Sequence, residues 1–427
     1  MPFKQHGRQY DVVVFGASGY TGKYTAQHIT THLPTNLKWA LAGRSRAKLE
    51  EVAAQCKALN HDRSQPEIEI CSLTNEDLAS LAKKTFVLIT LVGPYGKMGE
   101  PAFKACAENG THYLDVTGEV PFVAKMLRKY EAAAKASGAV MIPQIGIESA
   151  PSDLVTWSLA GLIRSAFHGA PMRDVTVSIH NLKSQGPSGG TLSTVLSLLT
   201  NFTLADLRAA HAPYALSPIP NPNVQHSLSL RAVQPGLLTR LTGLITVPSL
   251  GLLTSSIAAQ TDAAIVERTW GLLASTPQAY GPNFSFRQYM KARNWLSGVA
   301  IHLGLMLMGL VMVTPFLRRI AVKYVYKPGE GPDVEEAKKD SLEFRGVAVP
   351  DVQEGAGRQA FCRAWFHGSA YYLTGILLAE AAATLLEDGG EDENLPGGGI
   401  YTPACLGQPF IDRLDHAGFY FETKLLS

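Results

Sequence analysis

Short runs of apolar residues alternate with longer amphipathic stretches through the first 150 residues of the chain. The runs are nearly continuous in Val, Ile, Leu and Ala, which is typical of strands that helices cover on both faces. This alternation predicts βαβ units and a doubly wound, parallel α/β sheet. We expect six strands, at 10–15, 39–43, 67–71, 86–92, 111–116 and 139–146, separated by helices at 20–32, 47–59, 75–83, 101–109 and 122–137.

Beyond the sixth strand the pattern changes. A helix is predicted up to about Phe167, with Ser149 as its N-cap and Pro151 in its first turn. Asp174–Leu182 alternates like a half-buried strand, and the Gly-rich stretch Ser184–Thr191 reads as a loop that allows a ligand to approach closely. We therefore expect a dinucleotide-binding domain at 1–150 and a second, α+β domain with its own sheet, for substrate or dimerisation, at 151–427.

One segment of the second domain is unusually apolar. Leu296–Leu317 contains no charged residue, and at about 1.5 Å per residue it is long enough to cross a hydrocarbon core of about 30 Å. A second apolar stretch, Leu237–Ala259, is interrupted by an arginine, a proline and several glycines. The alternative places for the first segment are a protein core and a dimer interface. We favour lipid contact, as a hairpin or in the membrane plane, because cations flank the segment and the chain continues into a folded region. The flanking cations are Lys291, Arg293, Arg318, Arg319 and Lys323.

The composition of the chain agrees with lipid contact and argues against a nucleic-acid-binding protein. The 427 residues carry 38 Lys and Arg against 36 Asp and Glu, so the net charge of +2 leaves no basic stripe for nucleic acid. Charged residues make up 17% of the chain, below the about 25% of an average soluble protein. The five cysteines are scattered, which predicts reduced, mostly buried thiols and no metal site. The N-terminus lacks the apolar core of a signal peptide, so we expect a location on the cytosolic side.

The sharpest motif joins the first strand to the first helix. It reads GASGYTG, from Gly16 to Gly22. In this context Gly16 makes the tight turn, Gly19 admits the pyrophosphate and Gly22 allows close packing of helix and strand. The amides of the helix N-terminus then bind the phosphates, which is typical of a Rossmann-type domain. The predicted contacts from this motif are Gly16, Ser18, Gly19, Tyr20, Thr21 and Gly22.

The end of the second strand indicates which dinucleotide binds. An acidic residue at this point accepts from the ribose 2′-hydroxyl of NAD, whereas a cation accommodates the 2′-phosphate of NADP. Arg44 and Ser45 stand here, with Arg46 and Lys48 close behind. A guanidinium can pair with phosphate through two N–H groups and stack on adenine. We therefore predict NADP(H), with Arg44 and Ser45 at its 2′-phosphate.

The ends of the fourth, fifth and sixth strands supply the remaining candidates. Val92, Gly93 and Pro94 are expected to border the ribose and nicotinamide, and Tyr95 is the candidate proton donor, although it equally suits a packing wall. Asp115 and Glu119 could orient water or bind an amine, or they could cap the following helix or organise their loop, and we favour the second interpretation. Ser152 and Asp153 leave the same choice open. The spacing reveals no Ser/His/Asp or Cys/His constellation.

Together these motifs resemble the saccharopine dehydrogenase-like oxidoreductase family, which includes the trans-acting enoyl reductases. The resemblance implies an N-terminal Rossmann domain for NAD(P), a C-terminal mixed domain and, in eukaryotic members, membrane or lipid-droplet association. Characterised relatives reduce enoyl intermediates in glycolipid and polyketide assembly. The matching stretches are GASGYTG, LAGRS, LVGPYG, YLDVTGE, GIESAPSDL and SGGT, followed near the end by LPGGGIYTPACLG at 395–407.

The sequence thus predicts an NADP(H)-dependent oxidoreductase. It would reduce an enoyl, acyl or polyketide-like lipid intermediate, free or bound to a carrier, at a membrane or lipid-droplet surface. A saccharopine-type amino-acid dehydrogenase is one alternative, although the second domain lacks an obvious basic cluster to bind two carboxylates. A non-catalytic, lipid-associated Rossmann protein is the other, because a fold alone does not imply activity. The expected partners are an apolar small molecule, a lipid surface and a second copy of the chain.

Overall fold

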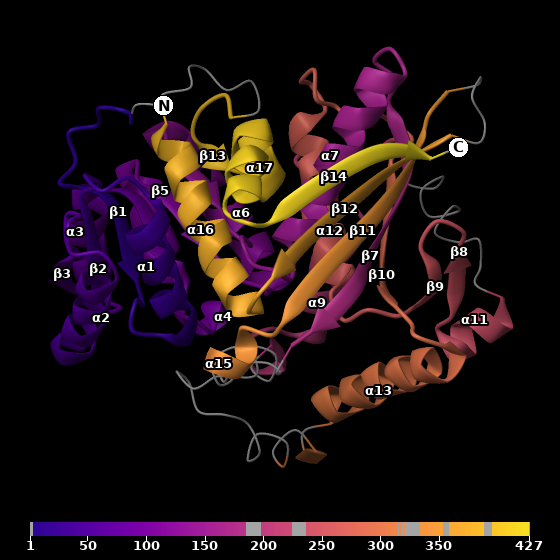
Figure 1. The fold of residues 1–427 in the computed structure, drawn as a ribbon, viewed down its shortest axis with the longest axis horizontal. Helices are drawn as coiled ribbons and strands as arrows, with labels where there is room; N and C mark the ends of the chain where they lie inside the picture. Colours follow the sequence, from indigo (N-terminus) through magenta and orange to yellow (C-terminus); the bar gives the residue numbers. More distant parts are fainter. Residues whose placement is uncertain are drawn as a thin grey trace.

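The structure is a computed structural model that describes residues 3–184, 198–223, 236–314, 316–317, 320, 334–352, 358–387 and 395–426. Within these ranges the chain forms two seven-stranded sheets with helices packed around them (Figure 1). The predicted loop at Ser184–Thr191 lies outside the described residues except for Ser184, as do the predicted flanking cations Arg318, Arg319 and Lys323.

The first sheet is parallel throughout and has the order β13-β6-β5-β4-β1-β2-β3. Its central strands are almost entirely buried, because helices cover both faces and leave little room for polar residues. The α/β class and the doubly wound arrangement are confirmed. The strands are β1 (Tyr10–Phe15), β2 (Trp39–Gly43), β3 (Glu67–Ile70), β4 (Thr85–Thr90), β5 (His112–Asp115), β6 (Val140–Ile142) and β13 (Gly399–Ile400). The helices are α1 (Tyr20–His32), α2 (Arg46–Leu59), α3 (Asn75–Lys84), α4 (Tyr95–Met98), α5 (Glu100–Asn109) and α6 (Val120–Ser137).

The expectation of six strands was wrong by one. Strand β13 comes from the far end of the chain and pairs Ile400 with Met141 of β6. Just before it in sequence, helix α16 packs lengthwise on α1 (Figure 1). Gly375 allows this contact, because a Cβ there would lie 2.9 Å from the backbone nitrogen of Thr25. The C-terminal region therefore completes the first sheet, and the division into 1–150 and 151–427 stays a prediction.

The second sheet is mixed and has the order β14-β12-β11-β7-β10-β9-β8. Helix α7 covers one face, where Gly346 of β11 makes room for Val155 and Leu159. The expected second sheet and the strand near Asp174–Leu182 are confirmed. The strands are β7 (Met172–Lys183), β8 (Ile245–Val247), β9 (Gly251–Thr254), β10 (Ser285–Lys291), β11 (Ser341–Pro350), β12 (Gln359–His367) and β14 (Tyr420–Leu426). The other elements are α7 (Ala150–Ala166), α9 (Leu204–Ala210), α11 (Leu237–Thr242), α12 (Ala259–Leu273), α13 (Trp295–Val313), α15 (Val334–Ala337), α16 (Ala370–Leu386), the 3₁₀ turn η2 (Pro403–Leu406) and α17 (Gly407–His416).

Helix α13 corresponds to the apolar segment and lies along the outside of the molecule (Figure 1). Of its 19 residues only Gly298 is buried, and Met306 and Leu307 are each 61% exposed. By length and composition it is the one helix of the described chain that is apolar enough to cross a membrane. Burial in this chain's own core, one of the two alternatives for this segment, is therefore wrong. The second apolar stretch, 237–259, folds mainly into α11 and the β8–β9 hairpin.

Candidate active site at the carboxyl edge of the first sheet

The glycine loop forms the tight turn that its sequence predicts. Gly16 has a φ of +90°, and a Cβ there would lie 3.0 Å from Val92 Cγ2. A Cβ on Gly22 would lie only 2.4 Å from the carbonyl oxygen of Gly16, so helix α1 can start this close to the loop only with glycine. The Gly19 amide donates to the same carbonyl at 2.9 Å and closes the turn.

The first turn of α1 leaves room for an anion. Gly19 is the N-cap, and no side chain in the described part of the chain caps this end. The first turn also carries no acidic residue, so its amide groups and the helix dipole meet no negative charge. A phosphate placed here would satisfy those amides. The cradle of glycines and free amides thus fits a dinucleotide pyrophosphate.

Arg44 stands beside this loop. The Gly16 amide donates to the carbonyl of Ala42 at 2.9 Å, which ties the loop to the end of β2 directly before Gly43 and Arg44. The side chains of Arg44, Ser45 and Arg46 are exposed. Arg46 has a long contact of 3.9 Å to Glu50 on the surface of α2, which contributes little. Arg44 therefore presents a solvated guanidinium where a 2′-phosphate would lie, although its contact with the cofactor stays a prediction.

Tyr95 is held as part of a packing wall. Its hydroxyl donates to the carbonyl of Thr90 at 2.9 Å, and its ring lies 6.0 Å from that of Phe122. Burial, followed by the nearby carboxyl of Asp115, raises the pKa of Tyr95 well above its usual range. Val92, Gly93 and Pro94, just before it, are half-buried and line the edge as predicted. A catalytic role for Tyr95 stays a prediction, but its hydroxyl is already bonded and faces no solvent.

Two buried carboxyl groups organise the loops after β4, β5 and β6. Asp115 accepts from the amides of Thr117 and Gln144, each at 2.9 Å. Glu119 accepts from the amides of Tyr95 at 2.7 Å and Gly96 at 3.0 Å. Burial raises the pKa of Asp115 to about 6 and that of Glu119 to about 7. Asp115 also accepts from the hydroxyl of Tyr113 at 2.7 Å. The four backbone amides that these two carboxyls accept from agree with the loop-organising interpretation.

The start of α7 brings in two further polar side chains. Asp153 accepts from the hydroxyl of Thr269 at 2.6 Å and the amide of Ala404 at 2.9 Å, so it joins α7 to α12 and η2. Ser152 donates to Asp262 in the first turn of α12. Ser149 occupies the predicted N-cap position, but its side chain does not cap the helix.

Glu148 and Asp262 are not among the site residues predicted from the sequence. Glu148 follows β6 inside the GIESAPSDL motif, and its side chain is exposed at the edge where the other loops meet. Glu148 could have been proposed from the sequence, because its carboxyl group follows just after a predicted strand. No feature of the sequence indicates Asp262, because it lies in a different region of the chain. It reaches the edge only through the packing of α12 on α7.

Comparison with known proteins shows which family has this fold and this glycine loop. Residues 12–142 match the model of the saccharopine dehydrogenase NADP-binding domain. A trans-acting enoyl reductase of Mycobacterium tuberculosis is 30% identical over 447 residues, covering 98% of this chain and 99% of that protein. The chain belongs to the saccharopine dehydrogenase-like oxidoreductase family. A trans-acting enoyl reductase of Mycobacterium leprae is 28% identical with the same coverage.

Among solved structures, saccharopine dehydrogenase (L-Glu forming) from Saccharomyces cerevisiae aligns with 97% of the chain at a TM-score of 0.51 and 13% identity, which shows that the two share a fold. As a saccharopine dehydrogenase-like oxidoreductase, the protein takes NADP(H) as cofactor. The glycine cradle and the first turn of α1 are the part of the structure that fits this cofactor.

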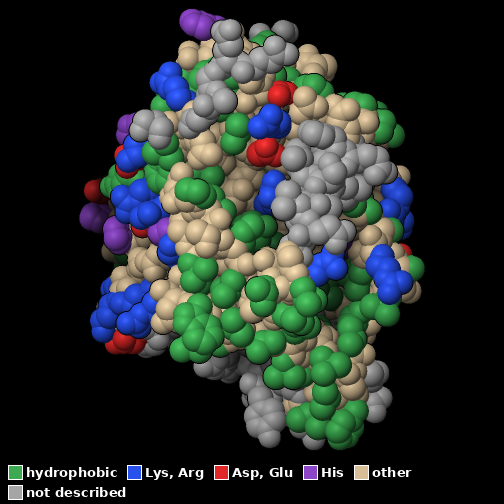
Figure 2. All heavy atoms as spheres, turned by 90° about the vertical axis from the view of Figure 1, so that its right-hand side faces the viewer, with side chains coloured by type: hydrophobic (Ala, Val, Ile, Leu, Met, Phe, Trp, Pro, Cys, Tyr) green, Lys and Arg blue, Asp and Glu red, His purple; other side chains and the backbone are tan. Residues whose placement is uncertain are grey.

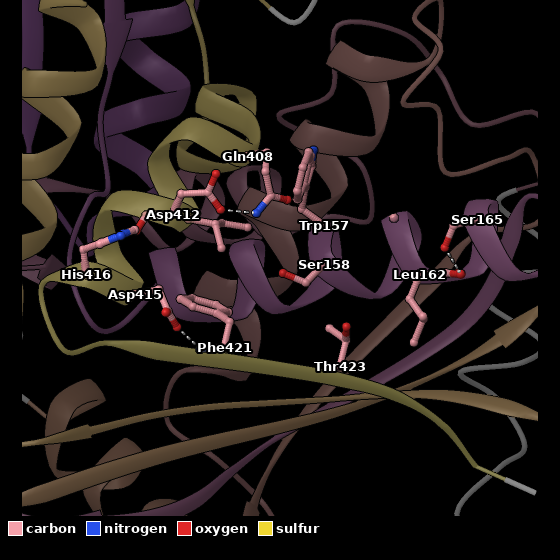
Figure 3. Close-up of a pocket in the computed structure, with 12 residues that line it drawn as sticks. Trp157, Ser158, Leu162, Ser165, Gln408, Asp412, Asp415, His416, Phe421 and Thr423 are labelled. Carbon is pink, nitrogen blue, oxygen red and sulfur yellow. Dashed lines mark hydrogen bonds between the residues drawn. The ribbon is translucent and has the colours of Figure 1, made fainter. Parts of the chain in front are cut away.

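The described residues contain no cluster of three or more His, Cys, Asp or Glu that could hold a metal ion. All five cysteines are buried and free, as predicted. A separate cavity of about 510 Å³ lies between α7, α17 and β14, with Trp157, Gln408 and Phe421 in its wall (Figure 3). None of the carboxyl-edge residues lines it, so it is not the cofactor site.

Proposed function

We propose that the protein is an NADP(H)-dependent reductase of an enoyl, acyl or polyketide-like lipid intermediate. The observation that carries this proposal is the full-length similarity to proteins named trans-acting enoyl reductase. The apolar exterior around α13 adds support, because an enzyme that works on long acyl chains must meet them where they dissolve. A carrier-bound substrate fits equally well, since the acyl chain would have the same chemistry.

The chain's own residues would bind and orient the cofactor. The amides at the start of α1 hold the pyrophosphate, Arg44 and Ser45 face the 2′-phosphate, and the half-buried Val92–Pro94 loop borders the nicotinamide. When bound, NADPH supplies a hydride. Tyr95 and Phe122 form a buried wall behind the loop and help to exclude water from the reacting end.

We also propose that α11 and α13 dock the protein on the cytosolic side of a membrane or on a lipid droplet. Their exposed side chains include Leu237, Leu238, Trp295 and Met306, and hydrophobic side chains gather over the lower part of this face (Figure 2). Neither helix contains an acidic residue. The exposed Arg293 precedes α13 and suits anionic head groups. Lipid is favoured over a second copy of the chain, because the exposed cation Arg293 borders this apolar face and neither helix carries an acidic residue.

The cofactor site is tested by fluorescence titration of the purified protein with NADPH and NADH. We expect NADPH to bind more tightly, and Arg44→Ala to weaken NADPH binding by at least about tenfold, because each charge-assisted hydrogen bond contributes about 1.5–3 kcal/mol. NADH binding should be nearly unchanged. Arg46→Ala is the matched control, since this neighbouring exposed arginine is the first residue of α2 and has only a long contact to Glu50. Equal losses for both dinucleotides would contradict a 2′-phosphate role for Arg44.

The reaction is tested by following NADPH oxidation with a long-chain trans-2-enoyl thioester in mixed micelles, and in parallel with saccharopine and NADP⁺. Turnover of the thioester alone would support the proposal. Turnover of saccharopine alone would replace it with the amino-acid dehydrogenase. Tight NADPH binding without turnover of either would remove both substrate assignments while leaving the oxidoreductase family intact.

A further inference from the structure

Most carboxyl groups at the carboxyl edge are already bonded. Asp115 and Glu119 each accept from two backbone amides, and Asp153 accepts from Thr269 and Ala404. Glu148 differs, because in the described part of the chain its carboxyl group has neither a hydrogen bond nor an ion pair. A carboxyl group that is not needed to hold the fold is available for chemistry.

Glu148 also lies on the correct half of the edge. In a doubly wound sheet the dinucleotide crosses the switch point, here between β1 and β4, so the Arg44 side binds adenosine and the side of β4, β5 and β6 faces the nicotinamide. Glu148 follows β6, and its Oε2 lies 3.0 Å from where a Cβ of Gly118, in the loop after β5, would stand. Gly118 therefore leaves space for this side chain at the reacting end.

A second, independent feature stands behind Glu148. The first turns of α7 and α12 meet at this edge, where Ser152 donates to Oδ2 of Asp262. Asp262 is 1% exposed, yet its Oδ1 has no partner among the described residues. A buried, unpaired carboxyl oxygen is costly unless a proton or a ligand satisfies it. The negative charge of Glu148 acts on this same group, so the two carboxyls are close enough to interact.

We propose that Glu148 is the catalytic acid of the reduction and that the Ser152–Asp262 pair is its positioning partner. This inference rests on the proposed function. The β-carbon of the enoyl group gains the hydride with its electron pair from NADPH, and the α-carbon gains a proton as the O–H bond of Glu148 breaks. The products are the saturated acyl group, NADP⁺ and the Glu148 carboxylate. Because Glu148 is exposed, it regains its proton from water.

The electrostatics support this assignment. Protein atoms packed around the Glu148 carboxyl reduce its hydration and raise its pKa, although part of the side chain reaches solvent. Burial, followed by the charges of Glu148 and Asp153, raises the pKa of Asp262 well above its usual range. Two neighbouring carboxyls resist ionising together, so a negative charge on either one favours the protonated form of the other. The acid must be protonated to act. The turnover number should therefore be constant at low pH and fall as the pH rises through the upper pKa of the pair.

The test combines kinetics with a direct titration. With the enoyl thioester, Glu148→Gln should lower kcat by about 10²-fold or more and remove the fall at high pH, while the NADPH dissociation constant changes less than about twofold. Glu148→Asp should recover part of the rate. Asp262→Asn should move the fall to lower pH, because Glu148 then ionises without a second carboxyl beside it. Ser152→Ala should move the fall in the same direction, because Asp262 without this hydrogen bond keeps its proton more firmly and opposes the ionisation of Glu148 less. Ser158→Ala, also in α7 but with its hydroxyl donating to the carbonyl of Leu154 in the same helix, should leave the profile unchanged.

Carbon-13 NMR of glutamate-labelled protein separates this inference from the proposed function. The Glu148 side-chain signal, identified by its absence in Glu148→Gln, should titrate above its ordinary value of 4.5 and shift downward in Ser152→Ala. A wild-type enzyme without turnover would overturn the proposed reaction, and the NMR titration would still test the carboxyl pair. An ordinary Glu148 titration, or full activity of Glu148→Gln, would overturn the inference.

Discussion

At the scale of single residues, the shape of the cofactor site depends more on how closely the backbone segments pack than on reactive side chains. Gly16 and Gly22 have no functional groups, yet a side chain on Gly22 would collide with the glycine loop itself, and one on Gly16 would press on Leu91 and Val92 after β4. Tyr95, the most reactive side chain that the sequence offers there, is bonded to Thr90 and buried. These contacts indicate a site that binds the cofactor closely and contains few catalytic side chains. This agrees with a reaction in which the cofactor supplies most of the chemistry.

The cradle gives a sharp prediction for Gly22→Ala. The added Cβ would lie 2.4 Å from the Gly16 carbonyl oxygen and 2.8 Å from Ala17 Cα, which are backbone atoms that cannot move independently. We expect a loss of about 1–3 kcal/mol of stability and NADPH binding weakened by at least about tenfold. Chemical unfolding and the fluorescence titration measure the two effects. Gly304→Ala, which has nothing within 4 Å of its Cβ, should leave both unchanged, and tight NADPH binding by Gly22→Ala would contradict the cradle.

Some residues of the site could be predicted from the sequence and others could not. The cofactor loop and Arg44 were predictable because strand, turn and helix are consecutive in the chain, so spacing alone fixes their relation. Glu148 was present in a quoted motif, but spacing cannot reveal that it lacks a partner while Asp115 and Glu119 have theirs. Asp262 was beyond reach, since 110 residues separate it from Ser152 and only tertiary packing joins them.

At the scale of elements, the exposed helix α13 is the feature that a water-soluble fold does not explain. It begins with a capping box in which Asn294 and Ser297 bond reciprocally, so its start is well defined. Gly298 then packs against Leu244, beside α11, and the rest of the helix projects its apolar side chains outward. The residues that form the helix were predictable from their hydropathy, whereas their exposure depended on which surfaces the remaining chain covers.

Lipid docking predicts a specific response to charge on this helix. The double variant Leu303→Glu, Met306→Glu places two carboxylates among exposed apolar side chains, and we expect co-flotation with anionic vesicles to fall by at least about tenfold. Binding should also weaken with added salt, because exposed cations contribute to it. Leu59→Glu, an exposed leucine at the end of α2, is the control and should bind like the wild type. Undiminished flotation of the double variant, or a wild type that stays in solution as a dimer, would contradict lipid docking.

At the scale of the whole molecule, the two sheets are joined more tightly than a linear division of the chain implies. Helix α16 lies on α1, β13 extends the first sheet, and Arg413 of α17 bonds to Glu380, which in turn contacts the buried His28 of α1 at 2.7 Å. A two-residue strand such as Gly399–Ile400 carries no periodic signal, so its place could not be predicted from pattern. The C-terminal region thus stabilises the cofactor domain that begins the chain.

This arrangement predicts that the protein unfolds as one cooperative unit. Gly375→Ala inserts a methyl group 2.9 Å from the backbone of Tyr24 and Thr25, one turn after the cofactor loop, and should lower the unfolding free energy by about 1–3 kcal/mol. Because α16 supports both sheets, loss of NADPH binding and loss of tryptophan fluorescence, which comes from both sheets, should share one lowered midpoint. Gly161→Ala in α7 is the matched control, since its Cβ meets only the end of an arginine side chain at 3.9 Å, and it should be neutral or slightly stabilising. Two separated transitions would mean that the cofactor domain folds independently and that the contact between α1 and α16 forms afterwards.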